Sequence, residues 1–257
     1  MQNKFSAICP VCESNNWDRI YRINEWDINE CKTCHFAIID PLPVRERRGE
    51  YYCEEKVIVR NIKKKTLSKK ISGALKKFFS KAAKRNKSKI FFDKFCKYLA
   101  PGAKVLDVGC GDGSFLRLAK SKFVGSGIEI STYLAGLAGK DSDLKIFSGD
   151  FLTTDTNEIY DGICMISLLE HLDSPQRALK KCFDNLNKGG VLLLKTVNYS
   201  CLNRKIKRGG WTGFRPPDHI VYFTPKNLTR MLRKVGFRKI RISSWPFNDN
   251  MYCDAFK

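Results

Sequence analysis

The sequence has 257 residues, of which 43% are hydrophobic and 12% aromatic, so it can bury a globular core and is not a disordered chain. It holds no run of about eighteen apolar residues and no apolar signal-peptide centre, so we expect a cytoplasmic protein. The formal net charge of +21 is concentrated between Lys56 and Lys97, where 16 lysines and arginines accompany one acid, Asp93. A confined basic stretch predicts an anionic partner: a membrane, a nucleic acid or a phosphorylated substrate.

Near the start of the chain, four of the eleven cysteines form two Cys-x-x-Cys pairs. They are Cys9 with Cys12 and Cys31 with Cys34, and the eighteen residues between the pairs can form a hairpin that brings them together. Four thiolates suit tetrahedral Zn²⁺, so we predict a structural zinc ribbon over residues 1–50, with an iron–sulfur cluster as the alternative. His35 is not counted as a ligand, because four thiolates already complete such a site.

The basic stretch has apolar residues at helical spacing. They are Leu67, Ile71, Leu75, Phe78 and Ala82. This pattern predicts a basic amphipathic helix within a segment covering residues 51–100. Its apolar stripe packs on its own domain or lies on an anionic membrane, in which case residues 56–97 make the protein peripheral at that membrane. A second helix is expected from Lys87 to Leu99, ended by Pro101 and Gly102.

From residue 101 to residue 257, short apolar runs alternate with helical stretches, which predicts an α/β fold with a parallel sheet covered by helices on both faces. The expected strands are Val105 to Val108, Val124 to Ile130, Leu144 to Phe147, Gly162 to Ile166 and Val191 to Thr196. A last helix is expected from Pro225 to Val235, with Gly236 after its end. Two final apolar runs, Lys239 to Ser243 and Met251 to Phe256, predict an antiparallel hairpin.

The strongest motif is a glycine-rich turn after the first strand of this sheet. It reads Asp107-Val108-Gly109-Cys110-Gly111-Asp112-Gly113. Glycines let the backbone approach a ligand closely. A dinucleotide fingerprint would need glycine where Ser114 stands, whereas here an acid precedes the first glycine by two residues, which suits a cationic cofactor.

On this motif the sequence resembles the class I family of S-adenosylmethionine (SAM)-dependent methyltransferases, from about residue 89 to the C-terminus. Three further stretches stand in the family's order: Gly127 to Ile130, Ser148 to Phe151 and Leu168 to His171. The resemblance implies a Rossmann-like fold in which the glycine loop holds the methionine part of SAM, Glu129 the ribose hydroxyls, and Asp150 with Phe151 the adenine. The implied cofactor-binding residues are Asp107, Gly109, Cys110, Gly111, Gly113, Glu129, Ile130, Asp150, Phe151, Ser167 and Glu170.

The N-terminal region carries a second resemblance. The two cysteine pairs, the turn from Ile39 to Pro43 and the pair Tyr51-Tyr52 are similar to methyltransferases with an N-terminal zinc ribbon in glycan and deoxysugar biosynthesis. This likeness implies a small-molecule or sugar acceptor, either a nucleotide-sugar or a glycan intermediate, and we expect this acceptor to be phosphorylated.

Candidate bases follow from the chemistry, because methyl transfer from a sulfonium needs an aligned acceptor and, for a hydroxyl or carbon acceptor, a group that removes its proton. His171 and His219 both lie in segments expected at the carboxyl edge of the sheet. His219 is the favoured base, since it ends a loop rich in aromatic and cationic residues, although bracing that loop is an equal alternative. His171 is expected to frame the cofactor pocket, and Tyr222 is a secondary candidate.

Two other functions are weighed against this one. An RNA methyltransferase also combines basic charge with a zinc module. However, the Asn/Asp-Pro-Pro-Tyr/Phe motif is missing where Ser167 to Glu170 stand, and the basic helix lacks interleaved aromatics, so nucleic acid is the less favoured partner. A protein that binds cofactor or a partner without turnover is the second alternative, and the intact glycine loop argues against it.

Overall fold

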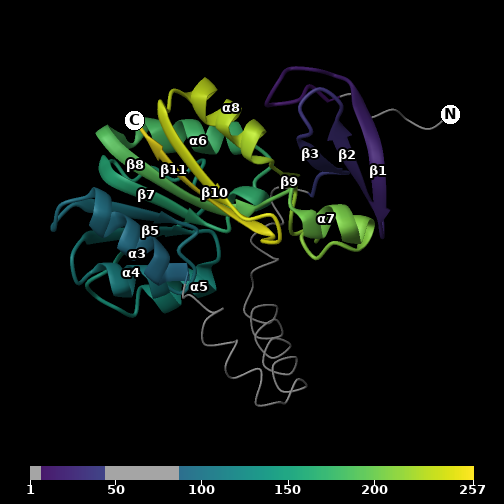
Figure 1. The fold of residues 1–257 in the computed structure, drawn as a ribbon. Coiled ribbons are helices and arrows are strands. Elements are labelled where there is room, and N and C mark those ends of the chain that lie inside the picture. Colours follow the sequence, from purple (N-terminus) through teal and green to yellow (C-terminus); the bar gives the residue numbers. More distant parts are fainter. Residues whose placement is uncertain (1–6, 44–86) are drawn as a thin grey trace, which may run out of the picture. The chain divides into compact units, whose positions relative to one another are not determined.

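The structure, a computed structural model, describes residues 7–43 and 87–257, which divide into two compact units (Figure 1). The first unit consists of the described residues up to Pro43 together with Glu158–Lys257, and the second ends at Asn157. The predicted basic amphipathic helix lies outside the described residues, as does most of the 56–97 stretch. None of the described helices is long and apolar enough to cross a membrane. The predicted domain limits at residues 50 and 100 stay predictions.

The second unit is built on three parallel strands: β4 (Lys104–Val108), β5 (Val124–Glu129) and β6 (Lys145–Ser148). Its helices are α3 (Lys87–Tyr98), α4 (Ser114–Ala119) and α5 (Thr132–Ala138). The apolar face of α3 is buried, and its Phe95 ring lies 5.9 Å from Phe115 and 6.1 Å from Phe123. This packing fixes α3 beside α4, the helix that follows the glycine loop.

The first unit contains the strands of the later half of the chain. Strand β7 (Tyr160–Ile166) is parallel to β8 (Leu186–Val197), and β11 (Asn250–Phe256) pairs antiparallel with both β8 and β10 (Lys239–Ser244). Helices α6 (Pro175–Asp184) and α8 (Pro225–Val235) run beside these strands in Figure 1. Gly236 follows α8 with a φ of 127°, a conformation that favours glycine, as its predicted place after the helix requires.

A smaller four-stranded sheet belongs to the same unit. Its strands are β1 (Trp17–Ile23), β2 (Trp26–Cys31), β3 (Ala37–Asp40) and β9 (Val221–Tyr222), in that order. The hairpin expected between the two cysteine pairs is confirmed by the antiparallel pairing of β1 with β2. The fourth strand, β9, comes from the opposite end of the sequence and pairs with β3.

The predicted fold class is confirmed, since the larger sheet has seven strands of mixed direction and includes a C-terminal antiparallel hairpin. Most strand ends agree with the sequence within two residues. The exception is β8, which begins at Leu186 and not at Val191. The sequence from Asn187 to Gly190 does not indicate a strand, because it contains only polar residues and glycines. In the structure Leu186 pairs with Tyr160, and the register between β7 and β8 shifts between Tyr160 and Gly162.

Candidate functional site

The glycine loop between β4 and α4 is held by its own backbone. The N–H groups of Gly109 and Cys110 donate to the carbonyl of Ile128 over 2.8 and 3.1 Å, and that of Gly113 donates to Cys110 over 3.0 Å. Gly109, Gly111 and Gly113 have φ values of 74°, 57° and 79°, in the left-handed region that favours glycine. A Cβ built on Gly111 would meet nothing within 4 Å, so the space beside the loop is open to a ligand.

Glu129 closes this loop from the end of β5. Its side chain is buried, with Oε2 accepting the N–H of Gly111 over 2.9 Å and Oε1 accepting that of Ser131 over 2.9 Å. Burial raises the pKa of Glu129, and the backbone donors oppose that shift. Each carboxylate oxygen can accept a second hydrogen bond, so the group fits a ligand with two adjacent hydroxyls, such as a ribose.

The other expected cofactor residues of the second unit gather at the same ends of its strands. Asp107 is buried in β4 and pairs with Gly127 of β5. The N–H of Gly149 donates to the carbonyl of Glu129 over 2.9 Å, which brings Asp150 next to the end of β5. The Asp150 carboxylate accepts the N–H of Leu152 over 2.8 Å. The cofactor roles of these residues, and those of Ile130 and the buried Phe151, stay predictions.

Three candidate residues of the first unit form a compact group, Glu170, His171 and His219, which we call the histidine cluster. Glu170 and His171 lie in η3 (Leu169–His171), and the two imidazole rings are 4.9 Å apart at 80°. The buried Glu170 accepts the hydroxyl of Thr196 over 2.8 Å at Oε2. Burial acts to raise the pKa of Glu170, but the charges of His171, His219 and Lys195 outweigh it and lower the pKa.

Both imidazoles are oriented by backbone carbonyls. Nδ1 of His171 lies 2.5 Å from the carbonyl of Asp218, and Nδ1 of His219 lies 2.7 Å from that of Gly213. A carbonyl only accepts, so each Nδ1 carries the proton and Nε2 is the acceptor atom of the neutral ring. Burial lowers the pKa of His219 to about 3, with the nearby charges of His171 and Arg215 adding to that shift and Glu170 opposing it.

Arg215 and Lys195 decide which ligands the histidine cluster suits. The ligand atoms of the cluster lie within 4.8 Å of one another, close enough to hold a metal ion. However, the guanidinium of the exposed Arg215 contacts Nε2 of His219, and the charge of Lys195 acts on Glu170. Two positive charges oppose a dication there, so the cluster is better suited to a hydroxyl or an anionic group.

The remaining first-unit candidates contact this cluster or its neighbours. Tyr222 is buried, and its hydroxyl donates to the carbonyl of His219 over 3.0 Å. Burial raises the pKa of Tyr222, so its hydroxyl stays protonated. This hydroxyl braces the loop of His219, by which we mean residues 211–219. Ser167 follows β7 with a φ of 59° and accepts Nζ of Lys195 over 2.6 Å. A lysine inside the apolar run of β8 was the sequence signal that could have pointed to Lys195.

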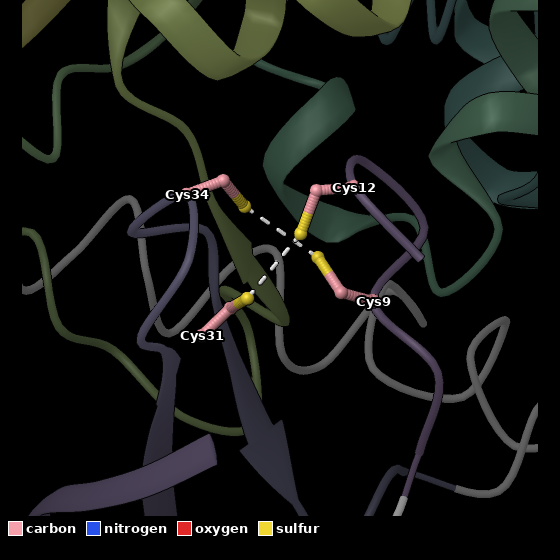
Figure 2. Close-up of side chains that lie close together, drawn as sticks. All are labelled: Cys9, Cys12, Cys31 and Cys34. Carbon is pink, nitrogen blue, oxygen red and sulfur yellow. Dashed lines mark hydrogen bonds between the residues drawn. The ribbon is translucent and has the colours of Figure 1, made fainter. Parts of the chain in front are cut away.

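The four cysteines meet as predicted (Figure 2). Their Sγ atoms lie within 4.8 Å of one another, with Cys9 3.6 Å from Cys34 and Cys12 3.5 Å from Cys31. A tetrahedral Zn²⁺ with Zn–S bonds of about 2.3 Å places sulfurs about 3.8 Å apart, so this set fits the ion. The contact between Cys9 and Cys34 lowers the pKa of Cys9 and raises that of Cys34, because one of the two sulfurs donates a hydrogen bond to the other. His35 lies outside the cluster of sulfurs.

Asp249, in the turn between β10 and β11, is a residue that the sequence did not single out. Its Oδ1 accepts Nε1 of Trp211 and Nδ2 of Asn203, both over 3.0 Å, and its Oδ2 accepts the hydroxyl of Thr212 over 3.1 Å. These contacts anchor the loop that leads to His219. Its sequence context, Asn248-Asp249-Asn250, reads only as a turn, so no local signal distinguished it.

Comparisons with known proteins bear on the family and the fold of the chain. A family model described as a methyltransferase domain matches residues 68–242. The chain is 33% identical over 105 residues to a ubiquinone biosynthesis O-methyltransferase of Coxiella burnetii, covering 38% of this chain and 44% of that protein. It is 31% identical over 110 residues to the (S)-coclaurine N-methyltransferase of Papaver somniferum, covering 39% and 31%. The chain thus spans less than half the length of these relatives.

A solved structure gives the same picture of the fold. The magnesium protoporphyrin IX methyltransferase of Synechocystis PCC 6803, with bound S-adenosylhomocysteine, matches with a TM-score of 0.53 at 18% identity. The match covers 66% of this chain and 81% of that one. At this identity the likeness concerns the fold.

Proposed function

Because the chain belongs to the family of methyltransferase domains, of the class I, SAM-dependent kind, we propose that it transfers a methyl group from SAM to a small-molecule acceptor. The observation that carries the proposal is the contact of Glu129 with the glycine loop, since a buried carboxylate at that place suits a ribose diol. The named relatives support a small acceptor, because one is an O-methyltransferase of ubiquinone biosynthesis and another an N-methyltransferase of coclaurine.

In this proposal the second unit holds the cofactor. Glu129 binds the two ribose hydroxyls, Asp150 and Phe151 contact the adenine, and the glycine loop together with Asp107 binds the methionine part. The support is the open space beside Gly111 and the convergence of these residues at the ends of β4, β5 and β6. SAM supplies an activated methyl group on a sulfonium, so the protein has mainly to orient the acceptor and take its proton.

The histidine cluster is the proposed acceptor side. An acceptor hydroxyl would donate to Nε2 of His219 in place of Arg215, whose exposed side chain can move aside. That exchange removes the charge of Arg215, which is one of the causes that lower the pKa of His219; burial and the charge of His171 still lower this pKa, and Glu170 raises it. As the acceptor oxygen bonds to the methyl carbon, the S–CH₃ bond breaks with its electrons going to sulfur, and the hydroxyl proton passes to His219.

The finer identity of the acceptor is proposed as a phosphorylated sugar, either a nucleotide-sugar or a glycan intermediate. The support is the ribbon-type cysteine pattern and a group of cations near the loop of His219. They are Arg204, Lys205, Lys207 and Arg208 on α7 (Leu202–Lys207) and η4 (Arg208–Gly210). We also propose a cytoplasmic location, with peripheral membrane attachment through residues 56–97. The four cysteines would hold a structural Zn²⁺.

An acceptor panel tests the proposal. The purified chain would be incubated with SAM and nucleotide-sugars, lipid-linked sugars, small phenols and amines, or bulk RNA, and S-adenosylhomocysteine release would be measured. Release with a sugar supports the full proposal, and release with a phenol or amine supports only small-molecule transfer. Release with RNA alone would overturn the acceptor class. Absence of SAM binding by calorimetry would overturn the cofactor assignment.

A further inference from the structure

We propose that the cysteine module, residues 7–43, is a positioning element of the acceptor side, so that metal binding at its four cysteines holds the loop of His219 in place. The proposal rests on the proposed function for the role of His219. A module that only recruits a substrate would need no built-in connection to the catalytic loop. Three sets of contacts, all within the first unit, make such a connection.

The first set is main-chain pairing. Ala37 pairs with Tyr222 and Ile38 with Val221, which makes β9 the fourth strand of the module's own sheet. The N–H of Ile39 donates to the carbonyl of Ile220 over 3.0 Å, while the N–H of Ile220 donates to the carbonyl of Glu170 over 2.7 Å. The residue that follows His219 is therefore held by the module on one side and by the histidine cluster on the other.

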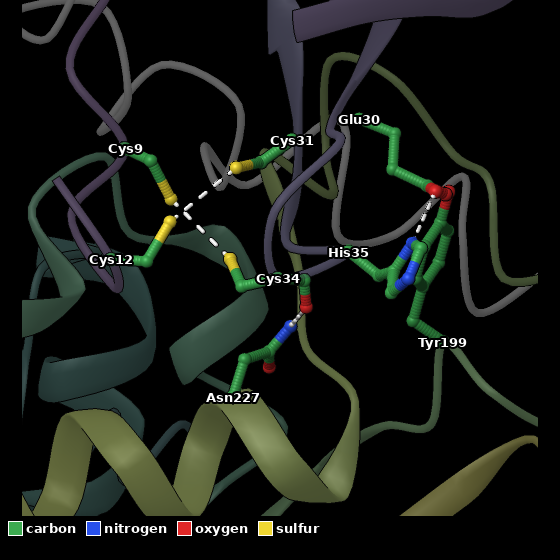
Figure 3. Close-up of polar contacts among 8 residues, drawn as sticks. All are labelled: Cys9, Cys12, Glu30, Cys31, Cys34, His35, Tyr199 and Asn227. Atoms are coloured by element: carbon green, nitrogen blue, oxygen red, sulfur yellow. Dashed lines mark hydrogen bonds and ion pairs between the residues drawn. The ribbon is translucent and has the colours of Figure 1, made fainter. Parts of the chain in front are cut away.

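The second set runs through Glu30 (Figure 3). Its Oε1 lies 2.8 Å from Nδ1 of His35, the residue directly after the metal-binding Cys34, and its Oε2 accepts the hydroxyl of Tyr199 over 2.6 Å. Burial raises the pKa of Tyr199, so its hydroxyl remains a donor. One carboxylate thus ties the cysteine turn to a buried residue that lies just after β8.

Tyr199 continues this connection to His219. Its ring centroid is 5.9 Å from that of Tyr222 and 6.2 Å from that of Phe214, and these two rings are 5.1 Å apart. The Tyr222 hydroxyl donates to the carbonyl of His219, and the carbonyl that orients the imidazole belongs to Gly213, the neighbour of Phe214. Close-packed aromatic rings transmit a displacement, because such interiors leave little free space.

The third set joins the cysteine turn to α8. The side-chain amide of Asn227 donates to the carbonyl of Cys34 over 3.5 Å, and the same residue forms the capping box with Thr224 that begins α8. The ring of Phe36, two residues after Cys34, lies 5.1 Å from that of Phe223 in the segment between β9 and α8. The turn from Cys34 to Phe36 therefore contacts both the residue that directly follows β9 and the first turn of α8.

The four cysteines explain why a metal would control these contacts. The turn that bears His35 is closed by two backbone bonds of 2.8 Å, from Cys31 to Phe36 and from His35 to Cys31. Ordering a short turn costs conformational entropy, and a structural metal contributes binding energy to folding the segment that holds it. With Cys31 and Cys34 both in the metal site, ion release would loosen the Glu30 and Asn227 contacts together.

Tyr199→Phe tests the proposal in the full-length protein, because it removes the hydrogen bond to Glu30 and keeps the ring. The matched control is Asp27→Asn. Asp27 lies in β2, as Glu30 does, but its described ion pairs, to Arg19 and Arg22, stay inside the module. Each variant is measured for metal content, hydrogen exchange of residues 219–223 and the ¹⁵N imidazole spectrum. The spectrum is assignable because the chain has only three histidines.

We expect Tyr199→Phe to retain its metal and to exchange about tenfold faster at residues 219–223, since a hydrogen bond to a charged group changes a local opening equilibrium by at least that factor. Its His219 ring should sample both neutral tautomers. Asp27→Asn should match the wild type in all three measurements. Equal behaviour of Tyr199→Phe and Asp27→Asn would overturn the proposal.

Metal removal from the wild type with a chelator gives the second arm. We expect faster exchange at residues 219–223, reversed when Zn²⁺ is restored, and no change in SAM affinity by calorimetry. Unaltered exchange after complete metal loss would contradict the coupling, and if the chain unfolds, the Tyr199→Phe result decides. A failure to bind SAM at all would overturn the proposed function and leave this coupling intact, so the two failures are distinguishable.

Discussion

The backbone N–H of Gly111 donates a 2.9 Å hydrogen bond to Oε2 of Glu129. The glycine loop and the acid at the end of β5 therefore form one unit, although the sequence places them 18 positions apart. Oε1 of the same carboxylate accepts the N–H of Ser131, which caps α5. The carboxylate thus orders both segments that would surround the cofactor, and it is positioned for a ribose by bonds that the protein itself makes.

Glu129→Ala is expected to lower SAM affinity at least about 100-fold, because it removes the two charge-assisted hydrogen bonds that we propose to the ribose and loosens the loop. Asp107→Ala should act in the same direction. Calorimetric titration with SAM measures both effects, and circular dichroism checks that the fold persists. Asp143→Ala, at an exposed acid of the same unit, serves as the control and should bind SAM normally. Full affinity in both test variants would remove the basis for the cofactor assignment.

Gly127→Ala probes the packing beneath the glycine loop. A Cβ there would lie 2.6 Å from Sγ of Cys110 and 2.8 Å from Cδ1 of Leu116, so these two side chains, or the loop and α4 that carry them, have to shift. We expect a loss of about 1–3 kcal/mol in the free energy of unfolding, together with weaker SAM binding.

Gly136→Ala is the matched control in the same unit. A Cβ at this exposed position of α5 meets nothing within 4 Å, and alanine favours a helix, so stability should rise by up to about 1 kcal/mol. Urea unfolding of both variants makes the comparison. A Gly127→Ala protein as stable as the wild type would show that the loop adapts without cost.

The parts of the structure that the sequence predicted are those with local signals. The strand, turn and helix around Gly109 follow from an apolar run and from glycines that the turn requires, and the cysteine pairs show their spacing directly. β9 gave no such signal, because it is two residues long and its partner, β3, lies near the other end of the chain. A two-residue strand has no period, so only tertiary pairing reveals it.

The candidate site was predictable to the same extent. His171 and His219 were both expected at the carboxyl edge of the sheet, and their rings lie 4.9 Å apart in the structure. Their catalytic roles, and that of Tyr222, stay predictions. Glu30 and Asp249 were missed because each acts through partners far away in sequence. An acid in a strand or turn usually faces solvent, and nothing local distinguishes the exceptions.

One zinc ion per chain is expected on elemental analysis, with iron absent after anaerobic purification, because four thiolates at these separations suit Zn²⁺. The double variant Cys9→Ser/Cys34→Ser should lose the metal, since it removes one sulfur from each pair. Cys96→Ser, outside the cluster, should keep it. A natively folded wild type that contains no metal would exclude the zinc site, and iron in stoichiometric amount would favour the cluster alternative.

The stability of the protein should fall as the pH drops from about 6.5 towards 3, through the buried His219. Its pKa is about 3 in the folded chain, against about 6.5 for an unperturbed histidine, so between these values the unfolded state binds the extra proton. The free energy of unfolding therefore rises with pH across this window and levels off above it. The contribution of His219 amounts to up to about 5 kcal/mol at the acid end.

Urea unfolding of the wild type and of His219→Gln at pH 7, 6 and 5 measures this contribution. The variant should lose less stability between pH 7 and pH 5, because glutamine does not titrate. Glu170 also weakens the fold in acid, since its pKa is lowered in the folded chain, but its loss begins only below about pH 4.5. Identical pH dependence in the wild type and His219→Gln would mean that His219 takes up its proton without unfolding. The assignment of His219 as a neutral ring whose Nδ1–H donates to the carbonyl of Gly213 would then be wrong.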